Sequence, residues 1–346
     1  MRPKLHKVTG CKPLNGQMVS RYHDGSLGSP ESADTWIEFL PQNCWKGINA
    51  DSLTNDEWNG ESNKAELTGR VLGIEESEDL KWYGLKSVDE FRKLLDVGDT
   101  SKPVNLRPTF GQNISNLSVP LKRRRKKWIN AEDGEIMGEA VMTRDPEVFY
   151  AKRKVEGKKH RTNLVILAGG NCNIKAKTIQ IRAKIYGKII DELQRQGHNV
   201  GVHCIDPIGS HHHDSAHFVC WQVKRHDEQM SVPQLQRDLG HPAVYRTAIF
   251  DVIGAAPVNP RGGLGYTAND IFDTPDASDS KTQALLEAIR LEIGEPTVIL
   301  NLLKLDANLN LDELDPLLNK IQAQLTNLIT RPKLTGIHII SNNEDK

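Results

Sequence analysis

Residues 163–206 constrain the fold more than any other part of the chain. The stretch NLVILAGGNCNIKAKTIQIRAKIYGKIIDELQRQGHNVGVHCID begins with a continuous apolar run, passes through a Gly-rich turn into a long helical pattern, and ends in a second apolar run. This order predicts a buried strand, a crossover helix and a second buried strand. In α/β proteins the turn after such a strand is a usual place for a ligand, so the turn AGGNCN is the first candidate site.

The rest of the C-terminal half repeats the alternation of strand and helix patterns. The crossover helix is expected over 175–196. We expect further helices over 231–254, 280–293 and 311–330, and further strands over 217–225, 297–303 and 335–341. Strands that alternate with helices predict an α/β fold with a mostly parallel sheet that helices cover on both faces. We assign this Rossmann-like, three-layer domain to residues 161–346.

The N-terminal half shows a different pattern. Residues 1–85 are polar, rich in Gly, Ser, Asn and Asp, and without a sustained period, so we expect an irregular N-terminal arm. Residues 86–160 are expected to hold one short helix over 87–98, with Ser87 as its N-cap and Gly98 at its end. A charged linker, in which two basic runs flank an acidic stretch, follows that helix.

Composition restricts the setting more than the activity. The 45 basic and 45 acidic residues cancel, so the net charge argues neither for nor against a polyanionic partner. The five cysteines form no CxxC pair, and the chain shows neither an apolar leader nor a run of eighteen apolar residues. We therefore expect free thiols, a cytoplasmic setting and no membrane span.

The turn AGGNCN lacks the signatures of nucleotide-binding turns. A P-loop requires GxxxxGK[ST] and a dinucleotide fingerprint requires GxGxxG, and the adjacent Gly169 and Gly170 supply neither pattern. Cys172 precedes a helix whose amides would lower a thiol pKa, so a thiol enzyme stays open as an alternative. No local signature places a histidine beside Cys172.

The basic segment KRRRKKW, the acidic turn EDGE and the element formed by His241, Pro242 and Arg246 follow a characteristic order around the first strand. In this order the chain resembles degenerate von Willebrand A-type (vWA-like) domains encoded by bacteriophages, whose function is unknown. The resemblance covers about residues 85–260. It implies a vWA-type fold and a viral origin. The protein would then act in the host cytoplasm or as part of the virion.

The resemblance also implies a degenerate metal site. In vWA-type domains the first strand ends in DxSxS, whose side chains help to hold a hard divalent cation. The overlay places Ala168 at the aspartate position, and Gly170 and Cys172 at the two serine positions. None of these side chains is a hard oxygen ligand, so we expect neither a metal nor another cofactor here. The turn is expected to bind a macromolecule instead, through Ala168, Gly170, Asn171, Cys172 and Asn173.

Histidines and cysteines gather in residues 203–220. His211, His213 and His217 are weak candidates for ligands of zinc or copper. The cysteines fall within predicted strands, in which neighbouring side chains alternate between faces, so we expect an exposed polar loop between two strands. A metal-dependent enzyme stays open as an alternative.

A basic run that ends in a tryptophan is a candidate nucleic-acid site, because lysine and arginine bind phosphates and an indole stacks on an unpaired base. The run comprises Lys122, Arg123, Arg124, Arg125, Lys126, Lys127 and Trp128. A second basic run covers 152–161. The neighbouring acidic stretch AEDGE offers an internal partner, so a charged linker is the competing interpretation.

These patterns favour a non-enzymatic adaptor or assembly protein that binds a phage or host protein. Its binding surface would be the loops at the carboxyl edge of the sheet, at 168–175, 206–217 and 255–270. A nucleic-acid-binding protein is the first alternative, and a metal- or thiol-dependent enzyme is the second. Association of the chain with itself also stays open.

Overall fold

A computed structural model describes most of the predicted C-terminal domain and parts of the N-terminal half. The described residues are 3–8, 19–25, 33–45, 84–85, 87–100, 126–136, 149–154, 161–168, 176–195, 198–209, 216–228, 231–244, 280–301, 335–341, 321, 323–325 and 327–328.

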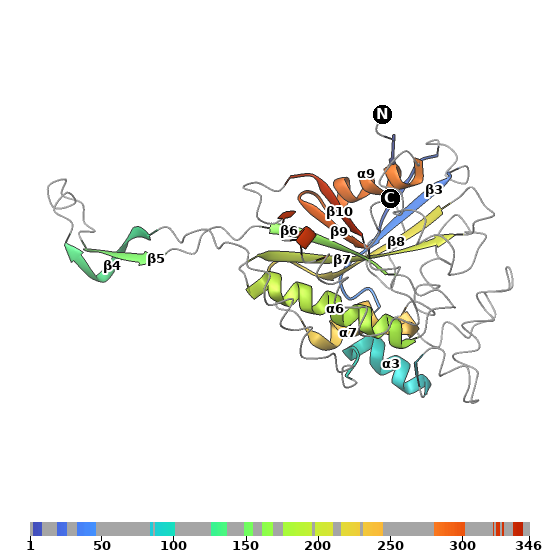
Figure 1. Ribbon diagram of the computed structural model, residues 1–346, viewed down its shortest axis with the longest axis horizontal. Coiled ribbons are helices and arrows are strands. Elements are labelled where there is room, and N and C mark those ends of the chain that lie inside the picture. The colour runs from blue at the N-terminus through green and yellow to red at the C-terminus, as the bar shows by residue number, and fades with distance from the viewer. Residues whose placement is uncertain are drawn as a thin grey trace.

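Most of the described strands join one eight-stranded sheet (Figure 1). Its order is β1-β2-β3-β8-β7-β6-β9-β10. The strands are β1 (His6–Val8), β2 (Ser20–His23), β3 (Thr35–Leu40), β6 (Arg161–Leu167), β7 (Asn199–Gly209), β8 (Ala216–Lys224), β9 (Thr297–Asn301) and β10 (Ile337–Ser341). Four of the seven described pairings are parallel, namely β3–β8, β6–β7, β6–β9 and β9–β10. The predicted α/β fold with a mostly parallel sheet is confirmed.

The apolar run of β6 is buried because helices cover both faces of the sheet. Successive side chains of a strand point to opposite faces, so Leu164 and Ile166 enter one core cluster while Val165 and Leu167 enter the other. Figure 1 shows α3 (Val88–Val97), α6 (Ala176–Arg195) and α7 (Val232–Gly240) on one side of the sheet, and α9 (Ser280–Glu292) on the other. The result is a three-layer arrangement of the described elements.

Helix α6 follows from the spacing of its apolar residues. Ile179, Ala183, Tyr186 and Ile190 recur at intervals of three and four residues, and all four are buried against the sheet. Helix α7 lies very close to α6, since a Cβ added to Gly240 would be 2.6 Å from the Cβ of Ala183. A glycine at this position allows the close approach of the two helices.

The ends of two other predicted helices, α3 and α7, can be compared with the structure. Helix α3 has the expected cap: the Ser87 hydroxyl accepts a hydrogen bond from the Glu90 amide at 3.1 Å, and Gly98 ends the helix. Helix α7 ends at Gly240 and is therefore shorter than the helix predicted over 231–254. Pro242 follows two residues later, where a proline can begin a new turn but cannot continue the previous one. Residues 245–254 lie outside the described part.

A buried charged pair within α7, Arg237 and Asp238, also contacts α3. Arg237 is fully buried, and its guanidinium donates to both carboxylate oxygens of Asp238, at 2.7 and 3.2 Å. A third N–H of Arg237 donates to the Leu95 carbonyl oxygen at 2.8 Å. The pair therefore stabilises the position of α7 against the end of α3.

The expectation of irregular structure in the N-terminal arm is wrong for three segments. Strands β1, β2 and β3 extend the large sheet beyond β8, and every residue of β3 is buried. The sequence TWIEFL of β3 alternates poorly because its charged residue, Glu38, has partners on β2 and β8 rather than in solvent. Long-range pairing, which no local period reveals, decides the structure here.

The charged linker expected within 86–160 also contains regular structure. Strands β4 (Lys126–Ile136) and β5 (Phe149–Lys154) pair antiparallel in a separate two-stranded ribbon. The register shifts between Asn130 and Glu135, so the stretch between these two residues is not paired with β5.

The remaining predicted elements agree with the structure to within a few residues. Helix α6 and helix α9 begin and end next to the predicted bounds, and β8, β9 and β10 lie within the predicted strands or one residue beyond them. Of the predicted helix 311–330 the described residues, which fall within 321–328, are helical. Among the helices that are described, none is long and apolar enough to cross a membrane.

Candidate functional site

The candidate site lies where the winding of the sheet reverses. Starting at β6, the chain places β7 and β8 on one side and later β9 and β10 on the other, so the order from β8 to β10 is 3-2-1-4-5. Open α/β sheets bind ligands outside the carboxyl ends of the strands at this switch point. Strand β8 is antiparallel to β7, and β3 is parallel to β8, so both contribute their amino ends to the same edge. We call it the carboxyl edge.

Asp206 occupies this edge beside the predicted turn. The pairing of β6 with β7 ends at Leu167 and Ile205, and the Ala168 amide donates to the Ile205 carbonyl oxygen at 2.8 Å. Asp206 is the next residue of β7, is 2% exposed, and has no hydrogen-bond partner at its Oδ2 atom. Burial raises the pKa of this carboxyl well above its usual value, and the Arg182 guanidinium of α6 offsets only part of the effect.

A second buried carboxylate, Glu38 of β3, lies between an arginine of β2 and a histidine of β8. Its Oε1 atom accepts a hydrogen bond from Arg21 Nε at 2.6 Å, and its Oε2 atom is 3.6 Å from His217 Nε2. Burial alone would raise the pKa of Glu38, but the His217 imidazole and the Arg21 guanidinium outweigh burial and lower it. Glu38 is therefore a compensated buried charge, whereas Asp206 is not.

The two carboxylates lie on the same face of the sheet but do not form one ligand set. Both Glu38 and Asp206 are register partners of Val219 of β8, one from each side. Two strand spacings separate them, which is about 10 Å. Within the ranges that the structure describes, no group of three or more His, Cys, Asp or Glu side chains is close enough to hold a metal ion.

His217 lies on β8 beside Glu38 and not in an exposed loop. Strands β7 and β8 extend to Gly209 and Ala216, so His217 belongs to β8 and is 2% exposed. Both of its ring nitrogens lack a hydrogen-bond partner. On β2 the His23 ring stacks on Trp36, with ring centroids 5.4 Å apart. His217 thus lies in a strand, as expected for 217–225, but it is buried, and β7 and β8 extend into the range 206–217 that was expected to be a loop.

The described thiols are poor candidates for nucleophiles. Cys44, Cys204 and Cys220 are all buried. Burial raises the pKa of Cys44 and of Cys220 well above the usual value, which disfavours the reactive thiolate.

Most of the residues predicted for the sites fall outside the described part. Of the predicted turn only Ala168 is described, and it is buried at the end of β6. Lys126, Lys127 and Trp128 lie in β4. The other predicted site residues, all outside the described ranges, are Gly170, Asn171, Cys172, Asn173, Lys122, Arg123, Arg124, Arg125, His211 and His213.

Sequence reasoning missed Asp206, Glu38 and Arg182 as members of a site. The available signal was a carboxylate within an apolar strand, in VHCID and in TWIEFL. Charged residues are rarely fully buried unless they are paired or functional, so each of these carboxylates called for a partner.

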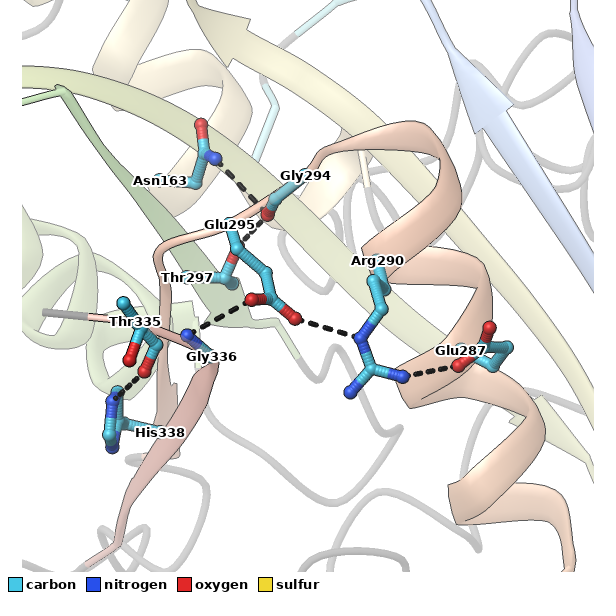
Figure 2. Close-up of polar contacts among 9 residues, drawn as sticks. All are labelled: Asn163, Glu287, Arg290, Gly294, Glu295, Thr297, Thr335, Gly336 and His338. Atoms are coloured by element: carbon cyan, nitrogen blue, oxygen red, sulfur yellow. Dashed lines mark hydrogen bonds and ion pairs between the residues drawn. The ribbon is translucent and has the colours of Figure 1, made fainter. Parts of the chain in front are cut away.

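The opposite, amino edge of the sheet holds a cluster of polar contacts that join several elements (Figure 2). Glu295 accepts hydrogen bonds from Arg290 Nε at 2.8 Å and from the Gly336 amide at 3.1 Å. The Asn163 side chain donates to the Gly294 carbonyl oxygen, which also accepts from the Thr297 hydroxyl. These contacts join α9, β6, β9 and β10, and they indicate a structural role for this edge.

Comparison with known proteins identifies the chain only at the level of a family. No curated protein and no solved structure matches it. Residues 49–313 match the profile of a family described as a domain of unknown function, DUF7192. The match spans more than half of the chain, and the chain therefore belongs to the DUF7192 family.

Proposed function

We propose that this chain is a vWA-like, non-enzymatic binding protein that docks a protein partner at the carboxyl edge. The observation that carries the proposal is Asp206: a buried, uncompensated carboxylate next to the carboxyl end of β6. Such a group destabilises the fold, and strongly perturbed groups of this kind concentrate at functional sites.

The order of the strands supports the vWA-like part of the proposal. The order 3-2-1-4-5 around β6 is that of a doubly wound, Rossmann-like sheet, with one antiparallel strand, β8. Ala168 directly follows β6, at the position where the vWA resemblance implies an aspartate. Recognition by protein groups instead of by a bound cation follows from this substitution. The bacteriophage origin remains a prediction from the resemblance.

The choice of binding over catalysis has its own support. The described thiols are buried, and Glu38 is engaged by Arg21 and His217. An adaptor or assembly role in the host cytoplasm or in a virion is compatible with this arrangement, as is association of the chain with itself.

Site-specific photo-crosslinking tests the proposal. Asp34 is exposed and immediately precedes β3 at the carboxyl edge, since its carbonyl oxygen accepts from the Ala216 amide. A photoreactive amino acid at position 34 should give crosslinked protein adducts in the cell that naturally produces the chain. These adducts should resist nuclease treatment. The matched control is the same amino acid at Arg161, which is exposed at the opposite edge.

The variant Asp206→Asn separates recognition from folding. It should reduce the yield of adducts at position 34 while the protein remains folded, because an uncompensated charge is removed. Equal adducts at positions 34 and 161, or adducts that nuclease abolishes, would contradict docking of a protein at this edge.

A further inference from the structure

The β4–β5 ribbon brings together two basic segments that are distant in the sequence. Across the ribbon Lys126 pairs with Lys154, Lys127 pairs with Arg153, and Trp128 pairs with Lys152. Three consecutive register pairs therefore hold five basic residues and one tryptophan. The basic runs at 122–128 and 152–161, which the sequence presents as separate features, meet in this ribbon.

The register argues against neutralisation within the ribbon. The acidic residues Glu132 and Asp133 fall in the stretch where the register shifts, and Glu135 pairs with Tyr150. No described register pair of the ribbon places an acidic residue opposite a basic one. Like charges directly opposite each other destabilise a sheet, so an external anion would stabilise this end of the ribbon.

The period of the strands separates the six residues into two sets. Lys126, Trp128, Lys152 and Lys154 share one face of the ribbon, because directly paired residues lie on the same face and residues two apart do as well. Lys127 and Arg153 share the other face. One face thus combines three cationic residues with one indole, the combination that binds a phosphate backbone and stacks on an unpaired base.

We propose that the β4–β5 ribbon is a binding site for single-stranded nucleic acid. Lys126, Lys152 and Lys154 contact the phosphates, and Trp128 stacks on one base. The site is separate in sequence from Asp206 and the carboxyl edge, so it is a second activity of the chain and does not rest on docking of a protein there.

The salt dependence of binding to a fluorescent single-stranded oligonucleotide of about 20 nucleotides tests this proposal. If the three lysines of this face contact phosphates, the logarithm of the affinity should fall against the logarithm of the salt concentration with a slope of about −2.1. Between about 50 and 200 mM salt the affinity should then fall roughly 20-fold.

Variants of one register pair test the ribbon itself. The double variant Lys126→Ala/Lys154→Ala should reduce the slope by about 1.4, and it should not weaken the ribbon because it removes two opposed like charges. The matched control is Lys4→Ala/Lys93→Ala, which removes the same charge from two exposed positions outside the ribbon and should leave the slope unchanged.

Substitution of Trp128 distinguishes single strands from other polyanions. Trp128→Ala should weaken single-strand binding roughly 5- to 100-fold, whereas Trp128→Phe, which retains a stacking ring, should weaken it less. Absence of oligonucleotide binding, a slope that the ribbon pair does not change, or equal binding of duplex with no effect of Trp128→Ala would each overturn the proposal.

Discussion

The two buried carboxylates of the large sheet should respond to neutralisation in opposite directions. Glu38→Gln should destabilise the protein at neutral pH, whereas Asp206→Asn should stabilise it. Both side chains are almost completely buried, at 0% and 2% exposure, so burial itself does not explain the difference. The difference comes from their partners: Glu38 has Arg21 at 2.6 Å, while the Oδ2 atom of Asp206 has no hydrogen-bond partner.

The magnitudes follow from these partners. Glu38→Gln retains an oxygen for Arg21 but leaves the buried guanidinium without its opposite charge, which should lower the free energy of unfolding by about 3 kcal/mol. Asp206→Asn removes a carboxyl group whose ionised form burial penalises, although the new amide N–H groups need acceptors. The net gain should be on the order of 1 kcal/mol.

The pH dependence has the opposite sign at the two positions. The folded-state pKa of Glu38 is lowered from 4.5, so its contribution is present above pH 4.5 and is lost as the pH falls through the folded-state pKa. The folded-state pKa of Asp206 is raised from 3.8, so its penalty grows as the pH rises above 3.8. The effects of both substitutions should therefore shrink in acid.

Urea unfolding followed by far-ultraviolet circular dichroism measures these differences at neutral pH and in steps toward acid. Asp89→Asn is the control, because this carboxylate is exposed on α3 and its ion pair with Arg92 should contribute less than about 1 kcal/mol. If Asp206→Asn destabilised the protein as much as Glu38→Gln, or if neither effect varied with pH, the assignment of a compensated and an uncompensated carboxylate would be refuted.

Three further predictions concern contacts away from the carboxyl edge, and urea unfolding also measures them. Gly240→Ala should destabilise by about 1–3 kcal/mol, because the added Cβ would lie 2.6 Å from the Cβ of Ala183, and unchanged stability would contradict the close approach of α6 and α7. Arg290→Ala should cost only about 0.5 kcal/mol, since its ion pairs are partly exposed; a loss as large as that of Glu38→Gln would contradict this. Arg237→Met should cost about 3–5 kcal/mol by depriving buried Asp238 of its counter-charge, and the double variant with Asp238→Leu should recover part of the loss.

The central strand–helix–strand unit could be predicted because its signals are local. The apolar run of β6, the helical period of α6 and the apolar run of β7 are each visible within one window of the sequence. The α/β class follows from their alternation with the later elements. The cap of α3 was predictable for the same reason, since Ser87 and Glu90 are three residues apart.

The members of the candidate site could not be predicted in the same way. The sequence directs attention to the turn after β6, whereas the structure adds Asp206 from β7 and Glu38 from β3. A charge inside an apolar strand shows that a partner is needed but not which residue supplies it. Arg21 is 17 residues from Glu38, and His217 lies much further along the chain.

By itself, the sequence determined the class of the fold, the elements of its centre and the absence of an aspartate at Ala168. Tertiary structure alone decided that β1, β2 and β3 complete the sheet, that two basic runs face each other in one ribbon, and that one buried carboxylate is compensated while the other is not. The physical reason is range: periods and caps act between residues a few positions apart, whereas strand pairing and charge compensation depend on residues that only folding brings together.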